Sequence, residues 1–191
     1  MGKFSSLFDE LVSFSNNDPI TGGSIGLNNI REDEYEVALI DRGFGKKMPF
    51  VINSDISDVV KSVCNPALNK EMNSRMLFDW VVKNIRYGEK KRRDGYRNSA
   101  EVFVDREGVC GESSFLYITM IRSIGVRASF VNVNRDGSEP YHACAMLDLP
   151  GKYGHFTLAD PANSLYDARH ASFRPLTDFE IFGNLNAWNR L

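Results

Sequence analysis

The chain has 191 residues, of which 42% are hydrophobic and 25% are charged, and its formal net charge is -2. This balance is typical of one soluble globular domain, with room for a modest extension. The near-neutral charge excludes a strongly basic nucleic-acid-binding protein, and no apolar run approaches the roughly 18 residues of a membrane span. We therefore expect neither a nucleic-acid partner nor a membrane partner.

The cysteines also limit where the protein works. There are only three, Cys64, Cys110 and Cys144. A small odd number in a chain of this length does not form a disulfide framework, so at least one thiol is free. The N-terminus lacks the apolar core of a signal peptide. A reducing cytoplasmic location is the prediction.

Residues 1–65 carry no recognisable motif and are predicted to be an N-terminal extension packed on a catalytic domain of residues 66–191. We predict the elements of this extension from three patterns. Apolar residues at helical spacing predict helices, extended apolar runs predict strands, and stretches rich in Asn, Gly and Ser predict loops. The elements are a helix over 4–14, a loop over 16–29, strands over 35–40 and 50–52, and a helix from Asp55 or Ser57 to residue 63, ended by Pro66.

A stronger helix is predicted over residues 72–87, with Asn69 or Asn73 as its N-cap. The basic loop that follows, residues 89–97, suits a phosphate or an acidic substrate. The near-neutral net charge of the whole chain favours a solvated loop that binds neither. Ser99 then begins a short helical turn over 100–104.

The helix predicted to start at Cys110 is apolar on almost every side, which is typical of a buried helix. Gly125 is its natural stop, because glycine readily takes the left-handed conformation that ends helices. Cys110 therefore sits at the first turn, where unpaired backbone N–H groups and the helix dipole stabilise a thiolate. Such a position suits a nucleophilic cysteine.

After this helix the apolar period changes to two, which predicts strands over 126–133, 141–149 and 155–159. Short turns between them, the first at 135–138, indicate an antiparallel meander. Residues 161–191 are predicted to form a few short turns. Helices followed by a sheet place the chain in the α+β class.

A cysteine nucleophile needs a base, and the base needs a partner that orients it. Of the three histidines, His142 lies in one predicted strand and Asp160 ends the next. If these strands are antiparallel neighbours, His142 can face Asp160, and its imidazole is then a candidate to take the thiol proton. His155 and His170 are predicted to be structural or exposed. Glu112 is predicted to cap the central helix or to pair with an arginine.

Five short motifs in this order resemble the transglutaminase-like superfamily of papain-like cysteine enzymes. The similarity covers roughly residues 70–162. The motifs are Trp-Val-x-x-x-Ile-x-Tyr at 80–87, Arg-x-Gly-x-Cys-x-Glu at 106–112, Arg-x-x-Gly-Val-x-Ala at 122–128, His-Ala at 142–143 and Asp-Pro at 160–161.

The resemblance implies a papain-like core in which a central helix packs on an antiparallel sheet. It implies Cys110 as nucleophile, His142 as base and Asp160 as the residue that orients the base. It also implies acyl transfer through a thioester by an amidase, peptidase or transamidase, on a protein or peptide substrate and without a cofactor. Whether the thioester passes to water or to an amine stays open.

One position departs from the family pattern, because Cys144 stands where an aromatic residue usually follows the histidine by two. Cys144 is expected to line the substrate channel, with a disulfide to Cys110 or metal binding as alternatives. The side-chain donor to the oxyanion is Tyr87, Asn84 or Asn98. The backbone N–H of Cys110 is expected to be the other donor.

Two other functions remain open at this stage. One is a binding or assembly module that keeps the fold with an idle site. The other is a metal site formed by Cys110, His142 and Cys144, although no familiar metal-binding spacing supports it.

Overall fold

The structure is a computed structural model that describes residues 49–88, 96–134 and 140–183. The predicted elements over 4–14, 16–29 and 35–40, the turn at 135–138 and most of the basic loop lie outside the described residues. The helices are α3 Ser54–Val63, α4 Lys70–Asn84, α5 Ser99–Asp105, α6 Cys110–Ser123, the 3-10 turn η1 Pro161–Asn163 and α7 Asp178–Gly183. The strands are β1 Arg86–Tyr87, β2 Glu107–Gly108, β3 Ala128–Asn134, β4 Pro140–Leu147, β5 Thr157–Asp160, β6 Leu165–Tyr166 and β7 Phe173–Leu176.

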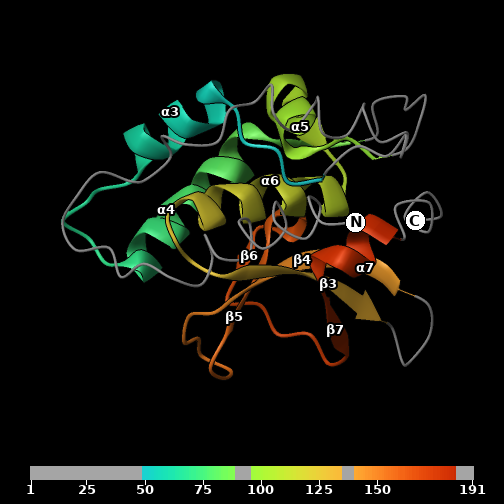
Figure 1. Cartoon of the computed structure of the whole chain (residues 1–191). Helices are drawn as coiled ribbons and strands as arrows, with labels where there is room; N and C mark the ends of the chain where they lie inside the picture. Colours follow the sequence, from blue (N-terminus) through green and yellow to red (C-terminus); the bar gives the residue numbers. More distant parts are fainter. Residues whose placement is uncertain (1–48, 89–95, 135–139, 184–191) are drawn as a thin grey trace, which may run out of the picture.

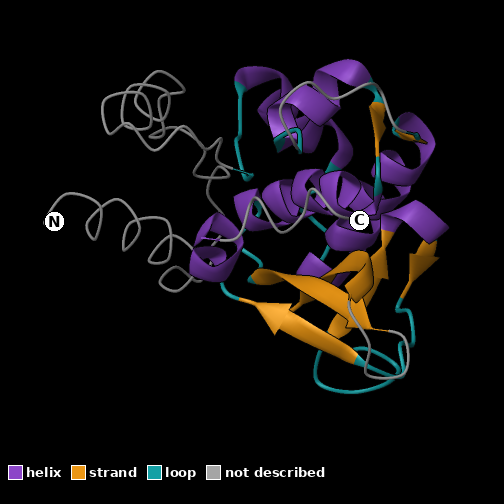
Figure 2. Ribbon diagram, turned by 90° about the vertical axis from the view of Figure 1, so that its right-hand side faces the viewer, coloured by secondary structure: helices purple, strands orange, loops and turns teal. Residues whose placement is uncertain are grey.

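The architecture is a layer of helices on one face of a five-stranded antiparallel sheet with strand order β6-β5-β4-β3-β7 (Figures 1 and 2). The predicted meander of β3, β4 and β5 is confirmed, since each is the antiparallel neighbour of the next. A small parallel pair, β1 and β2, leads into α6. The predicted α+β class, with a central helix packed on an antiparallel sheet, is confirmed.

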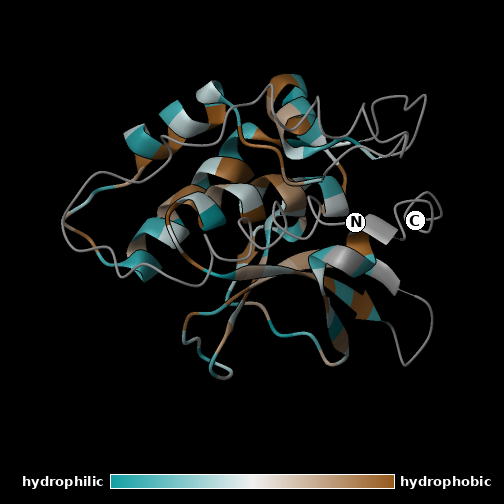
Figure 3. Cartoon of the chain, in the orientation of Figure 1, coloured by the Kyte–Doolittle hydropathy of each residue, from teal (hydrophilic) through white to brown (hydrophobic). Residues whose placement is uncertain are grey.

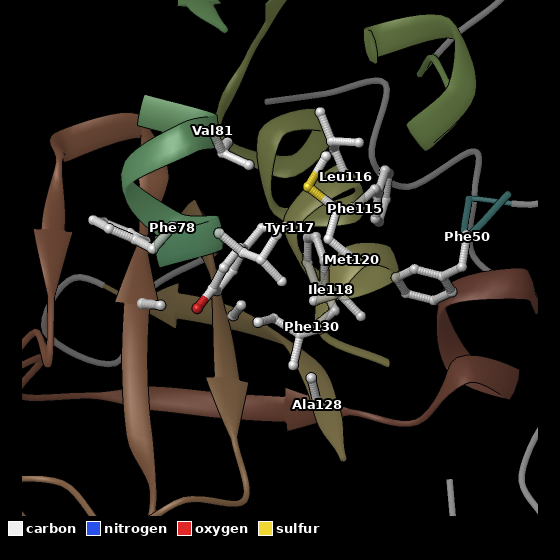
Figure 4. Close-up of a cluster of buried hydrophobic side chains, with 14 of the residues drawn as sticks. Phe50, Phe78, Val81, Phe115, Leu116, Tyr117, Ile118, Met120, Ala128 and Phe130 are labelled. Carbon is white, nitrogen blue, oxygen red and sulfur yellow. The ribbon is translucent and has the colours of Figure 1, made fainter. Parts of the chain in front are cut away.

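Helix α6 is the centre of the core, and every residue from Cys110 to Ile121 is buried. Its side chains contact α4 on one side and the sheet on the other, as Tyr117 and Phe130 illustrate in Figure 4. Figure 3 shows hydrophilic residues on the outward side of α3, whereas α6 carries few. Burial on all sides explains the absence of a single apolar stripe in its sequence.

Both ends of α6 agree with the prediction. The helix begins at Cys110, with Val109 as its N-cap. It ends before Gly125, whose φ of 71° lies in the left-handed region that favours glycine. The thiol and the glycine therefore mark the two termini of the central helix.

Helix α4 starts as predicted, because the side chain of Asn69 accepts a hydrogen bond from the N–H of Met72. Its predicted end at residue 87 is wrong. The helix stops at Asn84, and Arg86–Tyr87 form the parallel strand β1 beside Glu107–Gly108. Residues 86 and 87 therefore form strand hydrogen bonds with a distant segment in place of a last helical turn.

Two other predictions need correction. Residues 50–52 form no strand, because Val51 bonds through both its N–H and its C=O to the hydroxyl of Ser99 rather than to a neighbouring strand. The N-cap of α3 is Asn53, not Asp55 or Ser57. Its carboxamide accepts from the N–H of Ile56, which is the usual capping bond.

The C-terminal part contains more than the predicted short turns. Strand β6 extends the sheet beside β5, and β7 pairs with β3 at the opposite edge before α7 begins. Pro175 lies in β7, where an edge strand tolerates a residue without an N–H. None of the helices in the described parts of the chain is long and apolar enough to cross a membrane.

Candidate active site

Cys110 is the first residue of α6 and is 8% exposed. Strand β2 delivers the chain to this point, and the first turn of the helix leaves backbone N–H groups pointing out of its end. The thiol is thus held at the positive end of a buried helix dipole, where a negative charge is stabilised.

His142 and Asp160 meet as the strand pairing predicts. Strands β4 and β5 are antiparallel with Ala145 opposite Ala159, so the start of one lies beside the end of the other. The Nε2 atom of His142 lies 2.7 Å from Oδ2 of Asp160. With Nε2 engaged in this way, Nδ1 is the ring nitrogen left for the thiol of Cys110.

The electrostatics of His142 favour the charged ring. Burial lowers its pKa, but hydrogen bonds to Asp160 and Cys110 and the negative charges of both outweigh burial and raise the pKa to about 9. An imidazolium next to a sulfur atom is the partner that a thiolate needs. The three residues therefore suit proton transfer between a thiol and an imidazole.

Asp160 is fully buried and held from several directions. Asn163 donates its backbone N–H to Oδ1 at 3.1 Å and its side-chain amide to Oδ2 at 2.9 Å. Burial raises the pKa of Asp160, but the bonds from His142 and Asn163 outweigh it and lower the pKa below its ordinary value. The carboxylate stays ionised and fixes the orientation of the His142 ring.

The sequence did not indicate that two further residues, Asn163 and His170, belong to this site. Asn163 touches His142 as well as Asp160, with Nδ2 3.2 Å from Nε2 of the ring. His170, predicted to be structural or exposed, places Nε2 3.6 Å from Oδ2 of Asp160 and has a side chain only 14% exposed. The one sequence signal was the short interval from Asp160 to Asn163, which suits a polar turn.

The start of α6 is anchored by Glu112. Its carboxylate accepts from the N–H of Val109 at 3.1 Å and from Nη2 of Arg97 at 2.9 Å, and Arg97 also pairs with Asp105 at 2.7 Å. Both predicted roles of Glu112, cap and ion-pair partner, are confirmed. Arg97, however, is 12% exposed and does not belong to a solvated loop.

The three candidate oxyanion donors lie in different settings. Tyr87 is 61% exposed in β1. Asn84 donates its side-chain amide to the C=O of Trp80 within α4. Asn98 caps α5, and its carboxamide oxygen accepts from the N–H of Glu101. Their roles toward a substrate stay predictions.

Cys144 is fully buried in a small apolar cluster with Val131, Val133, Leu158 and Ala168. Its neighbour Ala143 packs with α6 in the main core, so Cys144 points to the opposite face of the sheet. All three cysteines of the chain are free. Burial is the main cause that raises the pKa of Cys144 above its ordinary range.

The metal site that the sequence left open as an alternative, formed by Cys110, His142 and Cys144, is not the group that the fold gathers. Within the part of the chain that the structure describes, the potential ligands that converge are His142, Asp160 and His170. Both cysteines lie outside that group.

A pocket of about 550 Å³ lies between the first half of α4 and the turn that leads into β5. Arg75, Lys152, Tyr166 and Asp167 are among its lining residues, but Cys110, His142 and Asp160 are not. This pocket is therefore separate from the histidine and the cysteine described above.

We expect the His142–Asp160 pair to make stability depend on pH. A histidine whose pKa is raised to about 9 by folding stabilises the protein fully below the ordinary value of 6.5 and loses that contribution as the pH rises through about 9. Asp160, with a lowered pKa, contributes above 3.8 and loses its contribution as the pH falls. Urea unfolding from about pH 6 to about pH 10 should show stability falling toward the alkaline end.

A His142→Gln variant is the control, because glutamine cannot carry the proton. Its free energy of unfolding should lack most of the decline below about pH 8; above that pH the buried thiols of Cys64 and Cys144, whose pKa values are also raised, add a decline that both proteins share. An identical decline in both proteins below that pH would contradict the assignment.

Comparison with known proteins gives one family. Residues 57–161, more than half of the chain, match the model of the transglutaminase-like superfamily. No sequence match is found among curated proteins.

Solved structures resemble the fold at low identity. A candidate cysteine protease from Cytophaga hutchinsonii has 15% identity and a TM-score of 0.48, covering 78% of this chain and 55% of that one. A candidate protease from Parabacteroides distasonis has 10% identity and a TM-score of 0.48, covering 65% and 25%. LapG from Legionella pneumophila has 12% identity and a TM-score of 0.49, covering 64% and 70%.

This chain thus spans about half the length of the first of these proteins and a quarter of the second. Similarities at this level say nothing about the reaction of this chain, whose chemistry must be read from its own residues.

Proposed function

This chain belongs to the transglutaminase-like superfamily, and from this premise we propose that it is a cysteine-dependent acyl-transfer enzyme acting on an amide bond of a protein or peptide. One observation carries the proposal. Nε2 of His142 lies 2.7 Å from the carboxylate of Asp160, and the same ring is close enough to Cys110 for that residue to help raise the pKa of His142. That order of groups is the one a nucleophile, a base and an orienting residue require.

In the first half of the reaction, Cys110 passes its proton to Nδ1 of His142 and its sulfur attacks the carbonyl carbon. The tetrahedral oxyanion accepts a hydrogen bond from the backbone N–H of Cys110 at the helix start. When it collapses, the C–N bond breaks, and the proton on Nδ1 moves to the leaving amine. A thioester on Cys110 remains.

In the second half, His142 takes a proton from water or from an acceptor amine, which then attacks the thioester. The C–S bond breaks, the acyl product leaves, and the proton on His142 is again shared with the sulfur of Cys110. Water makes the enzyme a hydrolase, and an amine makes it a transamidase. Asp160 keeps Nδ1 turned toward the sulfur through both halves, because it holds Nε2 from behind. No cofactor takes part in these steps.

The catalytic domain in this proposal covers residues 66–191, with 1–65 packed on it as an extension. The packing of Ile56 and Val60 of α3 within the same core as α6 supports such an extension. The three free cysteines suit the reducing cytoplasm that the sequence predicts.

Alkylation by iodoacetamide tests whether Cys110 is the reactive thiol. We expect rapid and selective labelling of Cys110 at neutral pH, because His142 stabilises its thiolate. Burial raises the pKa of Cys64 to about 11, and Cys144 is fully buried, so both should react slowly. Mass spectrometry identifies the labelled residue.

The variant His142→Ala should slow labelling of Cys110 by about 10-fold or more, because the thiolate loses its charged partner. Labelling of Cys64 in the same sample is the internal control and should not change. Slow and equal labelling of all three cysteines would exclude the proposal and favour a binding module that keeps the fold.

A further inference from the structure

The side chain of His170 lies next to the His142–Asp160 pair, on the side of Asp160. Nε2 of His170 lies 3.6 Å from Oδ2 of Asp160, the same oxygen that Nε2 of His142 approaches to 2.7 Å. The two imidazole rings are 6.0 Å apart, centre to centre. The three ligand atoms all lie within 4.8 Å of one another.

Nε2 of His170 is buried and has no hydrogen-bond partner in the described part of the chain. Leaving a buried polar atom without a partner costs about 1–3 kcal/mol. The triad mechanism gives this nitrogen no task, yet it faces a buried carboxylate and a second imidazole. A cation bound among the three groups would satisfy it.

The donor set decides which cation fits. Two imidazole nitrogens and one carboxylate oxygen suit Zn²⁺ and related first-row metals, whereas Ca²⁺ and Mg²⁺ prefer oxygen ligands throughout. Ligands at about 2.1 Å from a tetrahedral ion lie about 3.4 Å apart. The two observed distances to Oδ2, 2.7 Å and 3.6 Å, lie on either side of that separation, and all three ligand atoms lie within 4.8 Å of one another, so side-chain rotations can bring them onto one ion.

Both histidine side chains of the cluster are partly exposed at the surface. The side chains of His142 and His170 are 12% and 14% exposed, although Asp160 is completely buried. Because Nε2 of His170 is itself buried, an ion would enter from the histidine side as that ring rotates, and water would complete its coordination.

We propose that His142, Asp160 and His170 form an inhibitory binding site for a divalent transition-metal cation of the Zn²⁺ class. The binding site stands on geometry alone, whereas its inhibitory effect rests on the proposed function.

The inhibition follows from proton bookkeeping on one ring. When Nε2 of His142 binds the metal, the proton that Nε2 shared with Asp160 leaves to solvent. The imidazole then keeps on Nδ1 only the proton received from Cys110. This neutral, metal-bound ring is a far weaker acid than the imidazolium, so it cannot pass that proton to the leaving amine. Asp160, now a metal ligand, also stops orienting the ring for catalysis.

Binding of Co²⁺ tests the site without any substrate, since its visible absorption reports the ligands of the ion. The unmodified full chain should give the spectrum of a nitrogen- and oxygen-ligated ion. His170→Ala should weaken Co²⁺ binding by about 100-fold or more. His155→Ala is the matched control, because His155 is exposed and lies outside the cluster, and its affinity should equal that of the unmodified chain.

Cys110→Ala separates this site from a thiolate–imidazole site. Co²⁺ should bind this variant as it binds the unmodified chain. Loss of binding in Cys110→Ala, or equal affinity in His170→Ala and His155→Ala, would overturn the proposal.

A footprint on the unmodified chain avoids any effect of mutation on folding. Saturating Zn²⁺ should protect His142 and His170 from diethylpyrocarbonate, while His155 reacts at its metal-free rate. Unprotected His170 would also overturn the proposal.

A second experiment tests the inhibitory effect by measuring turnover of a peptide amide in the presence of Zn²⁺. Zn²⁺ should inhibit the unmodified enzyme and its His155→Ala variant equally, and His170→Ala should need about 100-fold more Zn²⁺ for the same fractional inhibition. An absence of turnover in metal-free buffer would refute the proposed function and leave the Co²⁺ result standing. Turnover that Zn²⁺ does not inhibit would refute the inhibitory role.

Discussion

Replacement of Cys110 by alanine should lower acyl transfer by a factor of about 10⁴ or more, because no other group can form the thioester. Loss of one member of a catalytic triad typically removes nearly all of the rate that the triad supplies together. The measurement is amine release from the best peptide amide in a library screened with the unmodified chain. Burst kinetics should disappear along with turnover.

Cys64→Ala is the matched control for this experiment. Cys64 is a free, half-buried cysteine at the end of α3, outside the group of Cys110, His142 and Asp160. Its replacement removes a thiol without touching the reaction, so turnover should stay within about two-fold of the unmodified value. Comparable turnover by Cys110→Ala and Cys64→Ala would exclude Cys110 as the nucleophile.

Replacement of Glu112 by alanine should destabilise the protein by about 3–5 kcal/mol, since it leaves part of a buried ion pair without its partner. Glu112 is completely buried, and it satisfies both the guanidinium of Arg97 and the N–H of Val109. A loss of this size is a large share of the about 5–15 kcal/mol that stabilises a typical domain. Urea unfolding monitored by tryptophan fluorescence gives the free energy.

Asp79→Ala offers the comparison at the surface. Asp79 pairs with Arg75 at 3.0 Å, but the two side chains are 59% and 53% exposed. Such a pair contributes only about 0–1 kcal/mol because water screens it. Equal losses from Glu112→Ala and Asp79→Ala would show that the Arg97 network does not stabilise the helix start.

The Glu112 network also connects stability with the candidate chemistry. Val109, which Glu112 holds through its N–H, directly precedes Cys110. The orientation of the helix start therefore depends on a carboxylate that is two residues past the thiol and on an arginine from another segment. Destabilisation of this network should loosen the position of Cys110 before the whole domain unfolds.

Much of the fold was determined by local sequence. The all-round apolar character of α6, its start at Cys110 and its end before Gly125 were predicted correctly. The cap of α4 was narrowed to Asn69 or Asn73, and the structure selects Asn69. Helix periodicity and capping are local properties, because the groups that interact lie three or four residues apart.

The proximity of His142 and Asp160 could also be predicted from the sequence. A period of two and short turns predict neighbouring antiparallel strands, and that topology brings the start of β4 beside the end of β5. The ordered family motifs supplied the assignment of each residue, which the topology by itself left open.

The remaining features depended on tertiary structure, because each needs a partner that is distant in sequence. Strands β1 and β7 are short, and they exist only through pairing with β2 and β3. Arg97 belongs to a basic stretch that reads as solvated, yet Glu112, 15 residues away, makes its burial favourable. His170 reaches Asp160 only because the chain turns back after β6. Local sequence therefore determined the helix that carries the thiol, whereas long-range packing decided which charged groups surround it.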